Sequence, residues 1–281
     1  MNRLAHPLAA PRDNEHQKLA SPAVAVRLIR DGDTIAVGGF GPNGFSEPFA
    51  LALEQRFLAG GVRGLTLVYC ASRGDGRTHG LNRFGHPGLV KRVIGGQWSM
   101  VPRLYELALT NRIEGYSLPQ GVILRLFRDI AAGRPGHVTK AGLGTSVDPR
   151  NGGGRINTAG SEDLVSLVRV AGEDALFYRA FPIRAAIVHA NISDTDGNSA
   201  VNSESLAVAH AARQAGGLVI VCTDHVGTVR GTGPRETLLT ADQVDCVVPA
   251  NPTESNWETF APPFDAKFSE ETLALPHDPT V

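Results

Sequence analysis

The sequence predicts an α/β fold in which helices cover both faces of a mostly parallel sheet. Short apolar runs alternate along the chain with stretches whose apolar positions recur at helical spacing. These runs are nearly continuous, which is typical of parallel strands that are buried on both faces. The 281 residues suffice for a substantial hydrophobic core.

The expected elements follow one another in β-α order. Six apolar runs are strand candidates: residues 34–37, 65–70, 90–94, 185–190, 218–222 and 244–248. Four helix candidates lie between them: residues 46–58, 102–111, 121–132 and 203–214. Residues 161–181 depart from this order, because two apolar stretches flank Gly172-Glu173-Asp174, and they predict a small β-hairpin.

The ends of the chain differ from its middle in composition. We expect a loosely ordered arm at residues 1–20, a folded domain at 21–250 and a proline-rich tail at 251–281. The first residues are interrupted by charges and lack the apolar core of a secretory signal. No apolar run approaches the ~18 residues of a spanning helix, so we expect a cytoplasmic protein without a membrane contact.

Charge and cysteine usage exclude several classes of function. The formal net charge of −1 disfavours nucleic-acid or membrane-surface binding driven by electrostatics. Cys70, Cys222 and Cys246 lie far apart, and the nine histidines do not fall at metal-ligand spacing. We therefore expect buried free thiols in a reducing compartment and no metal site.

A glycine-rich turn after the first strand is the strongest functional signal. Residues 38–44 read Gly-Gly-Phe-Gly-Pro-Asn-Gly, and Ser46 is a suitable N-cap for the helix that follows. Exposed N–H groups at such a junction suit a phosphate, a carboxylate or an oxyanion. The spacing of Gly39, Gly41 and Gly44 also fits a dinucleotide fingerprint. The acid expected after the second strand is absent, although Arg73 would suit a 2′-phosphate.

Two further segments invite a chemical interpretation. Gln120, in the sequence Pro-Gln-Gly after a brief strand, has an amide N–H suited to an oxyanion or a thioester carbonyl; a plain capped turn is the alternative. Arg150 lies among glycines, including Gly144, in a segment suited to phosphate, where the alternative is a solvent loop turned by Asp148-Pro149. Residues 191–198 read as a structural Asx-type turn.

These four segments, in this order, resemble family I coenzyme A transferases over about two thirds of the chain. Residues 31–44 match the family's Asp-Gly…Gly-Gly-Phe…Gly signature, but Ser46 stands where it usually ends in proline. The resemblance implies the open fold of NagB, RpiA and the CoA transferases. It also implies acyl-CoA and carboxylate substrates, with no tightly bound cofactor.

The resemblance assigns roles to particular residues. Gln120 would polarise the thioester, and the substrate or CoA would be contacted by Gly38, Gly39, Phe40, Gly41, Gly44, Gly144 and Arg150. Some relatives have Pro-Glu-Asn where this chain has Ser46-Glu47-Pro48, which favours acetate or propionate over 3-oxoacids.

The family's nucleophilic glutamate has no counterpart in this sequence. It lies in Ser-Glu-Asn-Gly or Glu-x-Gly-x-x-Gly strings of the family's second half, and neither string occurs here. Glu47 and Glu204 both begin helices, where the helix dipole alone favours a carboxylate. We therefore expect an α subunit whose β partner supplies the glutamate, in an αβ or α2β2 assembly. Alternatives are a CoA-ester hydrolase or ring-opening enzyme, a non-catalytic CoA-binding subunit and an NADP-dependent oxidoreductase.

Overall fold

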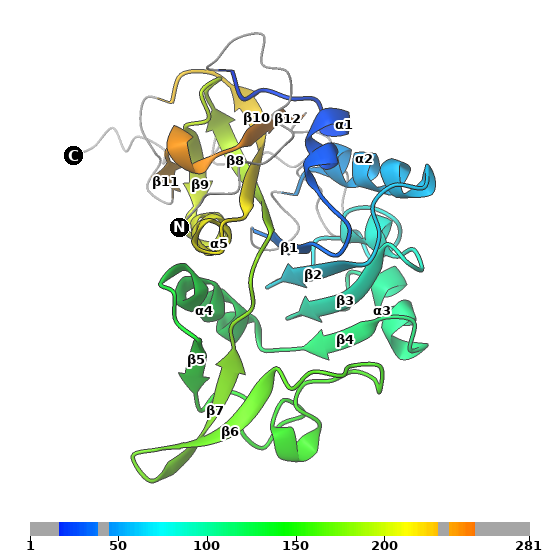
Figure 1. The fold of residues 1–281 in the computed structure, drawn as a ribbon, viewed down its shortest axis with the longest axis vertical. Coiled ribbons are helices and arrows are strands. Elements are labelled where there is room, and N and C mark those ends of the chain that lie inside the picture. Colours follow the sequence, from blue (N-terminus) through cyan, green and yellow to red (C-terminus); the bar gives the residue numbers. More distant parts are fainter. Residues whose placement is uncertain (1–16, 39–44, 230–235, 251–281) are drawn as a thin grey trace, which may run out of the picture.

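A large parallel sheet forms the centre of the molecule (Figure 1). The computed structural model describes residues 17–38, 45–229 and 236–250. Seven parallel strands lie in the order β4-β3-β2-β1-β8-β10-β12. Their bounds are β1 Thr34–Val37, β2 Leu65–Tyr69, β3 Val90–Gly95, β4 Glu114–Ser117, β8 Ala185–Ser193, β10 Leu218–Val226 and β12 Cys246–Pro249.

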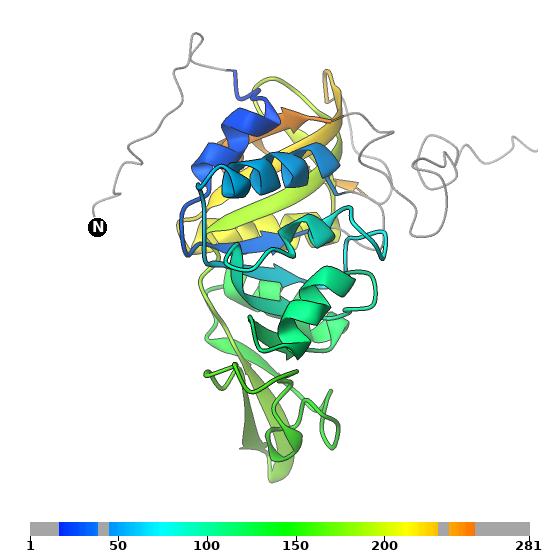
Figure 2. The same ribbon diagram turned by 90° about the vertical axis from the view of Figure 1, so that its right-hand side faces the viewer.

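Helices cover both faces of this sheet, as the sequence predicts (Figures 1 and 2). Helices α4 and α5 pack on one face, and α1, α2 and α3 pack on the other. Their bounds are α1 Pro22–Ala25, α2 Glu47–Leu58, α3 Pro102–Leu109, α4 Gln120–Ala131 and α5 Ser203–Gln214. The expected α/β fold is confirmed.

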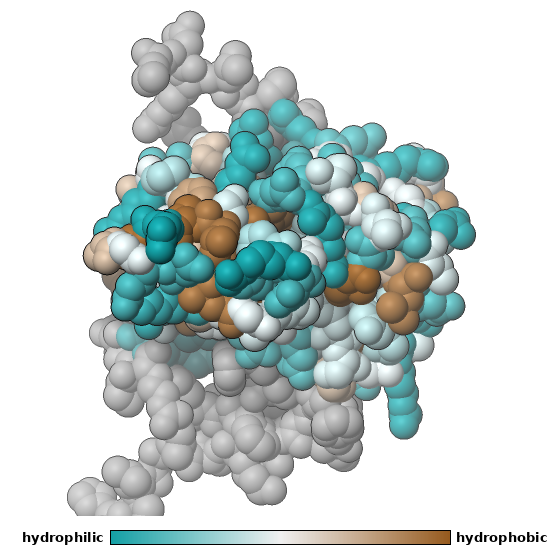
Figure 3. Space-filling model, turned by 90° about the horizontal axis from the view of Figure 1, so that it is seen from below, coloured by the Kyte–Doolittle hydropathy of each residue, from teal (hydrophilic) through white to brown (hydrophobic). Residues whose placement is uncertain are grey.

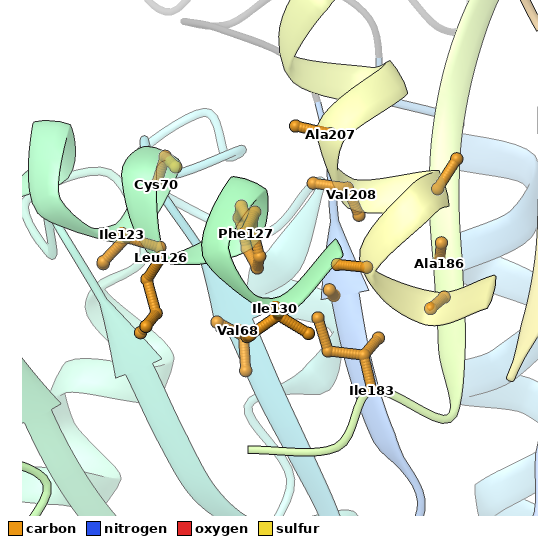
Figure 4. Close-up of a cluster of buried hydrophobic side chains, with 14 of the residues drawn as sticks. Val68, Cys70, Ile123, Leu126, Phe127, Ile130, Ile183, Ala186, Ala207 and Val208 are labelled. Carbon is orange, nitrogen blue, oxygen red and sulfur yellow. The ribbon is translucent and has the colours of Figure 1, made fainter. Parts of the chain in front are cut away.

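Alternation along each strand divides the core into two layers. In β1, Ile35 and Val37 face the α2 layer, whereas Ala36 faces the α4–α5 layer. Figure 4 shows the second layer, where Val68 and Phe127 pack below Val208 of α5. Strands buried on both faces explain the nearly continuous apolar runs in the sequence.

Local sequence signals set the helix starts. The Oγ of Ser46 accepts a hydrogen bond from the Phe49 N–H at 3.3 Å and caps α2. Asn202 caps α5 in the same way, accepting from the Ser205 N–H at 2.8 Å. Side-chain acceptors at these positions satisfy N–H groups that have no partner within the helix.

Short antiparallel strands complete the fold. Strands β9 (Ser199–Asn202) and β11 (Glu236–Leu239) pair antiparallel beside the end of β8. The predicted hairpin is present as β6 (Val165–Val170) and β7 (Glu173–Arg179), and β5 (Gly136–Thr139) extends it to a separate three-stranded sheet. Residues 18–20 lie beside β12, where Leu19 bridges Val247.

The three-stranded sheet forms the lower end of the molecule in Figure 1. Seen from that end, the described surface is largely hydrophilic, with separate apolar patches (Figure 3). Val138 and Val170 of this sheet are about half exposed. No described helix has both the length and the apolar character needed to cross a bilayer.

Candidate functional site

The carboxyl ends of the parallel strands meet at one edge of the sheet. From β1 the chain builds the strands β2, β3 and β4 on one side, and β8 begins the other half on the opposite side. Ligands of open α/β sheets bind outside the carboxyl ends of strands, next to such a reversal of strand order. Gly38 after β1, Cys70 after β2, Gly96 after β3 and Gln120 after β4 all lie at this edge.

Gln120 is fixed by its position between a strand and a helix. It is the first residue of α4, it is half-buried, and it follows β4 by only two residues. A Cβ atom at Gly96 would lie 2.2 Å from the Cys70 carbonyl oxygen and 2.6 Å from Cγ of Gln120. Gly96 is therefore needed for Gln120 to pack against the ends of β2 and β3.

The requirement for glycine at position 96 was not inferred from the sequence. The available signal was the Gly95-Gly96 pair directly after an apolar strand. Glycine at a strand end often marks close approach of another segment or of a ligand. The glycine turn after the first strand carries a longer motif than this pair, which by itself does not indicate which segment approaches it.

Gly38 brings the end of β1 against α5. A Cβ atom at Gly38 would lie 3.1 Å from Cα of Ser205 and 3.2 Å from Cγ1 of Val188. The N-terminus of α5 thus adjoins the carboxyl edge of the sheet, where its dipole favours negative charge. The other predicted residues of the glycine turn, Gly39, Phe40, Gly41 and Gly44, lie outside the described residues.

A buried ionisable group of residues lies between β2 and α5. The Cys70 thiol donates a hydrogen bond to the Glu204 carboxylate, and the Arg73 guanidinium attracts the same carboxylate electrostatically. Burial raises the pKa of Glu204, and Arg73 and Cys70 oppose that rise. Burial also lowers the pKa of Arg73 to about 10, against the effect of Glu204. The sequence predicted none of these contacts.

Gly144 and Arg150 form a compact turn with Asp148. The guanidinium of Arg150 donates to both Asp148 oxygens, at 2.9 and 2.6 Å, and the Gly144 N–H donates to Asp148 at 2.9 Å. These bonds hold the pKa of the Asp148 carboxyl well below its usual range. Among the described residues, the hydrogen bonds and ion pairs of Arg150 lead to Asp148 and Asp174, not to Gln120. The CoA-binding role of Gly144 and Arg150 stays a prediction.

The loop after β2 is held by carboxylates on two sides. The Asp75 carboxylate accepts hydrogen bonds from three successive N–H groups, at residues 77–79, and from the His79 ring at 2.8 Å. Glu54 of α2 accepts from Arg83 at 2.7 Å and pairs with His86 at 2.6 Å. This network, to which Glu47 adds a further bond to Arg83, fastens the loop to α2.

The acidic, histidine and cysteine side chains of the described residues pair with one another or lie apart. No group of three or more histidine, cysteine, aspartate or glutamate side chains gathers there as a metal site. His189 instead pairs with Asp224, with Nε2 and Oδ1 at 3.0 Å. The cysteines Cys70, Cys222 and Cys246 are buried and free.

Comparison with known proteins agrees with these observations. The family model described as coenzyme A transferase matches residues 19–248. The chain is 35 % identical over 269 residues to the caffeate CoA-transferase of Acetobacterium woodii, covering 92 % of this chain and 51 % of that protein. It is 29 % identical over 181 residues to the acetate CoA-transferase subunit alpha of Escherichia coli K12, covering 64 % of this chain and 73 % of the subunit.

Solved structures give the same result. The crystal structure of the acyl-CoA transferase YdiF from Escherichia coli O157:H7 superimposes with a TM-score of 0.81 at 29 % identity, covering 91 % of this chain and 50 % of YdiF. A YdiF thioester complex with CoA matches with the same score and identity. The chain thus spans about half the length of the caffeate enzyme and of YdiF. The family model matches most of the chain, and the parallel sheet agrees with the fold of the solved relatives. The chain therefore belongs to the coenzyme A transferase family.

Proposed function

We propose that this chain is the α subunit of an acyl-CoA:carboxylate CoA-transferase and that a β partner supplies the nucleophilic glutamate. The observation that carries the proposal is the placement of Gln120 at the start of α4, packed on Gly96 at the carboxyl edge of the sheet. A neutral amide N–H there can stabilise the negative charge that develops on a thioester oxygen during attack.

The reaction proceeds through covalent intermediates. The partner's glutamate attacks the thioester carbonyl, which expels CoA thiolate and leaves an acyl–glutamyl anhydride. The thiolate then attacks the glutamyl carbonyl, which releases the carboxylate and forms a glutamyl-CoA thioester. An acceptor carboxylate reverses these steps to give the new acyl-CoA. Gln120 is proposed to donate a hydrogen bond to the oxyanion in each tetrahedral stage.

The relatives support both the reaction and the need for a second half. YdiF, about twice as long as this chain, has been crystallised as a thioester complex with CoA. The acetate CoA-transferase of Escherichia coli K12 instead has a separate alpha subunit, which is also similar to this chain. We propose the two-subunit arrangement, αβ or α2β2, in a reducing cytoplasm that keeps the three thiols free.

The acceptor carboxylate and the acyl group of the donor thioester are both proposed to have short chains. The Ser46-Glu47-Pro48 sequence lacks the asparagine of some 3-oxoacid relatives, and relatives named for acetate match this chain. Acetate and propionate are therefore the first substrates to test.

The experiment co-expresses the chain with the polypeptide encoded beside it and purifies through a tag on this chain alone. The complex is incubated with propionyl-CoA and acetate, reduced with borohydride, and both polypeptides are examined by mass spectrometry. Acetyl-CoA formation together with a reduced glutamate on the partner supports the proposal. Release of free CoA alone would identify a hydrolase, and a chain that binds CoA with no turnover would be a non-catalytic subunit.

A further inference from the structure

A pocket lies at the edge of the sheet opposite Gln120, where the parallel strands begin. Its volume is about 260 Å³, it lies between the starts of β2, β3 and β4, and the arrows of these strands point away from it in Figure 1. We call it the amino-edge pocket and define it by Gly64, Gly88, Lys91, Asn111, Arg112 and Glu114. The proposed transfer of CoA takes place at the carboxyl edge and makes no use of this pocket.

A β-bulge places Lys91 at the amino-edge pocket. Val90 and Arg92 of β3 pair with two consecutive residues of β2, so Lys91 between them is an extra residue without a partner in the ladder. Bulges are frequent at sheet edges and beside functional sites, where they redirect a side chain. Val90 is buried in the core, whereas Lys91 is exposed and lines the pocket.

The end of α3 places a second cation, Arg112, at the same pocket. Asn111, two residues after the helix, has a left-handed backbone with φ 55°, and the Arg112 N–H donates to the Leu107 carbonyl oxygen at 2.9 Å. This helix termination leads the chain directly into β4, the neighbour of β3. The carbonyl end of a helix carries about half a negative charge, which offsets part of one cation and not two.

The polar side chains of the amino-edge pocket are mainly hydrogen-bond donors. The side chains of Lys91 and Arg112 form no hydrogen bond or ion pair with any described residue, and neither group can accept a hydrogen bond. The Asn111 side-chain oxygen accepts from the N–H and the hydroxyl of Thr158, at 3.2 and 3.1 Å, so its NH₂ group remains to donate. Glu114 also lines the pocket, but its carboxylate is paired with Arg92 at 2.7 Å.

We propose that the amino-edge pocket binds a small phosphate-bearing ligand, such as a phosphate monoester or pyrophosphate. A ligand that satisfies two cations and an amide donor must supply several acceptor oxygens and more than one negative charge. A guanidinium binds two phosphate oxygens at once, and an ammonium adds a point charge beside it. The pocket is slightly smaller than the roughly 300–1,000 Å³ of sites for drug-sized ligands, which favours a phosphate group with a short organic part.

Binding can be measured without CoA and without a partner subunit. The full chain is titrated calorimetrically with glycerol 3-phosphate, pyrophosphate, succinate and acetate in about 0.15 M NaCl, which screens attraction between exposed charges. We expect saturable binding of a phosphate compound, at least ~10-fold tighter than that of succinate or acetate. No binding of either phosphate compound, or equal affinity for succinate, would overturn the inference.

Hydrogen exchange locates the bound ligand. Pyrophosphate should slow amide exchange at the start of β3 and at residues 110–114, because a ligand in the amino-edge pocket restricts opening of these segments. Protection found only around Gln120 would place the ligand at the proposed thioester site and contradict the proposal.

Variants then connect affinity with the two cations. Lys91→Gln and Arg112→Gln should each weaken binding at least ~10-fold, since each removes a charge-assisted hydrogen bond. Arg128→Gln removes the same charge from an exposed position of α4 and is the matched control, which should keep the affinity. An equal loss in Arg128→Gln would indicate unspecific attraction and contradict a built site.

A fourth variant tests the space instead of the charge. Ala159 lines the pocket and is half-buried, so Ala159→Leu fills the pocket while both cations remain, and it should also weaken binding at least ~10-fold. If Lys91→Gln fails to fold by circular dichroism, Arg112→Gln and Ala159→Leu decide the outcome. The rate of CoA transfer should stay unchanged in all four variants. Unaltered ligand affinity in both Arg112→Gln and Ala159→Leu would refute the site.

Discussion

At the scale of single residues, the site depends on glycines, which have no side chain, as much as on Gln120. Gln120 is the residue with the chemistry, but Gly96 leaves the space in which Gln120 packs. Gly38 has the same relation to Ser205. Gly38 and Gly96 thus each follow the last residue of a strand, at the edge where helices α4 and α5 begin.

Replacement of Gln120 tests the amide directly. Gln120→Ala should lower kcat of the assembled enzyme by about 10- to 1000-fold, the range for the loss of one oxyanion donor. The fold should be retained, because the side chain is half-buried at a helix start. Steady-state kinetics with propionyl-CoA and acetate measure the effect, with exposed Gln55→Ala as control. An unchanged kcat would remove Gln120 from the mechanism.

Replacement of Gly96 tests the space that Gln120 needs. In Gly96→Ala the new methyl group would overlap both the Cys70 carbonyl oxygen and Cγ of Gln120, so Gln120 must shift and kcat should fall at least ~10-fold. Gly121→Ala is the matched variant, since its methyl group meets no atom within 4 Å and helix propensity favours alanine by about 0.5–1 kcal/mol. Thermal unfolding and kinetics of both variants are compared. Full activity of Gly96→Ala would contradict this packing.

At the scale of elements, the loop after β2 is the part most dependent on charge. Asp75 holds three backbone N–H groups of that loop, and Arg83 joins it to two carboxylates of α2. These charged side chains are largely shielded from solvent. They stabilise the fold through charge-assisted hydrogen bonds, and loss of one partner would leave the other charge buried and unpaired.

The buried network predicts a large loss when its cation is removed. Arg83→Met leaves Glu47 and Glu54 without their shared partner, and we expect the free energy of unfolding to fall by ~3–5 kcal/mol. Glu173→Gln breaks the mostly exposed ion pair with Lys140 and should change the free energy of unfolding by less than ~1 kcal/mol. Urea unfolding of the two variants distinguishes these effects. Similar losses in both would argue against a special role for burial.

The environment of the Asp75 carboxyl predicts that the free energy of unfolding falls as the pH is lowered. Burial raises the pKa of its carboxyl, but the His79 ring and the backbone N–H groups outweigh burial and lower it from 3.8 to about 2. A depressed folded-state pKa gives stability that is present above pH ~4 and lost as the pH falls towards ~2, about 2 kcal/mol in all. Urea titrations between these pH values should show a flatter dependence for Asp75→Asn. Asp196→Asn, at an exposed position, should keep the wild-type slope.

At the scale of the whole molecule, the sequence predicted the main architecture because its parallel strands are buried on both faces. The six strands and four helices that the periodicity predicts are present, with ends that differ by a few residues. Strands β9 and β11 were not predicted, because four residues with mixed polarity carry no clear period. Glu204 and Arg73 meet through the sheet topology, which no local pattern reports. The roles of Gln120 and the glycine turn stay predictions.

The sheet order also predicts how the molecule opens. Strand β8 lies between β1 and β10 and is buried along most of its length, whereas β6 is largely exposed. Amide hydrogens of β8 should therefore exchange only through global unfolding, and those of β6 and β7 through local opening at lower free energy. Hydrogen exchange followed by mass spectrometry measures both. Equal protection of the two regions would indicate a single cooperative unit.

The buried cysteines have a practical consequence for labelling. Burial raises the pKa of Cys70, Cys222 and Cys246, and in the folded chain these thiols are both inaccessible and protonated. A thiolate is the form that reacts with maleimide, so the native protein should remain unmodified at neutral pH. One cysteine introduced at an exposed position, such as Ser203, would then accept a fluorophore selectively without removal of any natural cysteine.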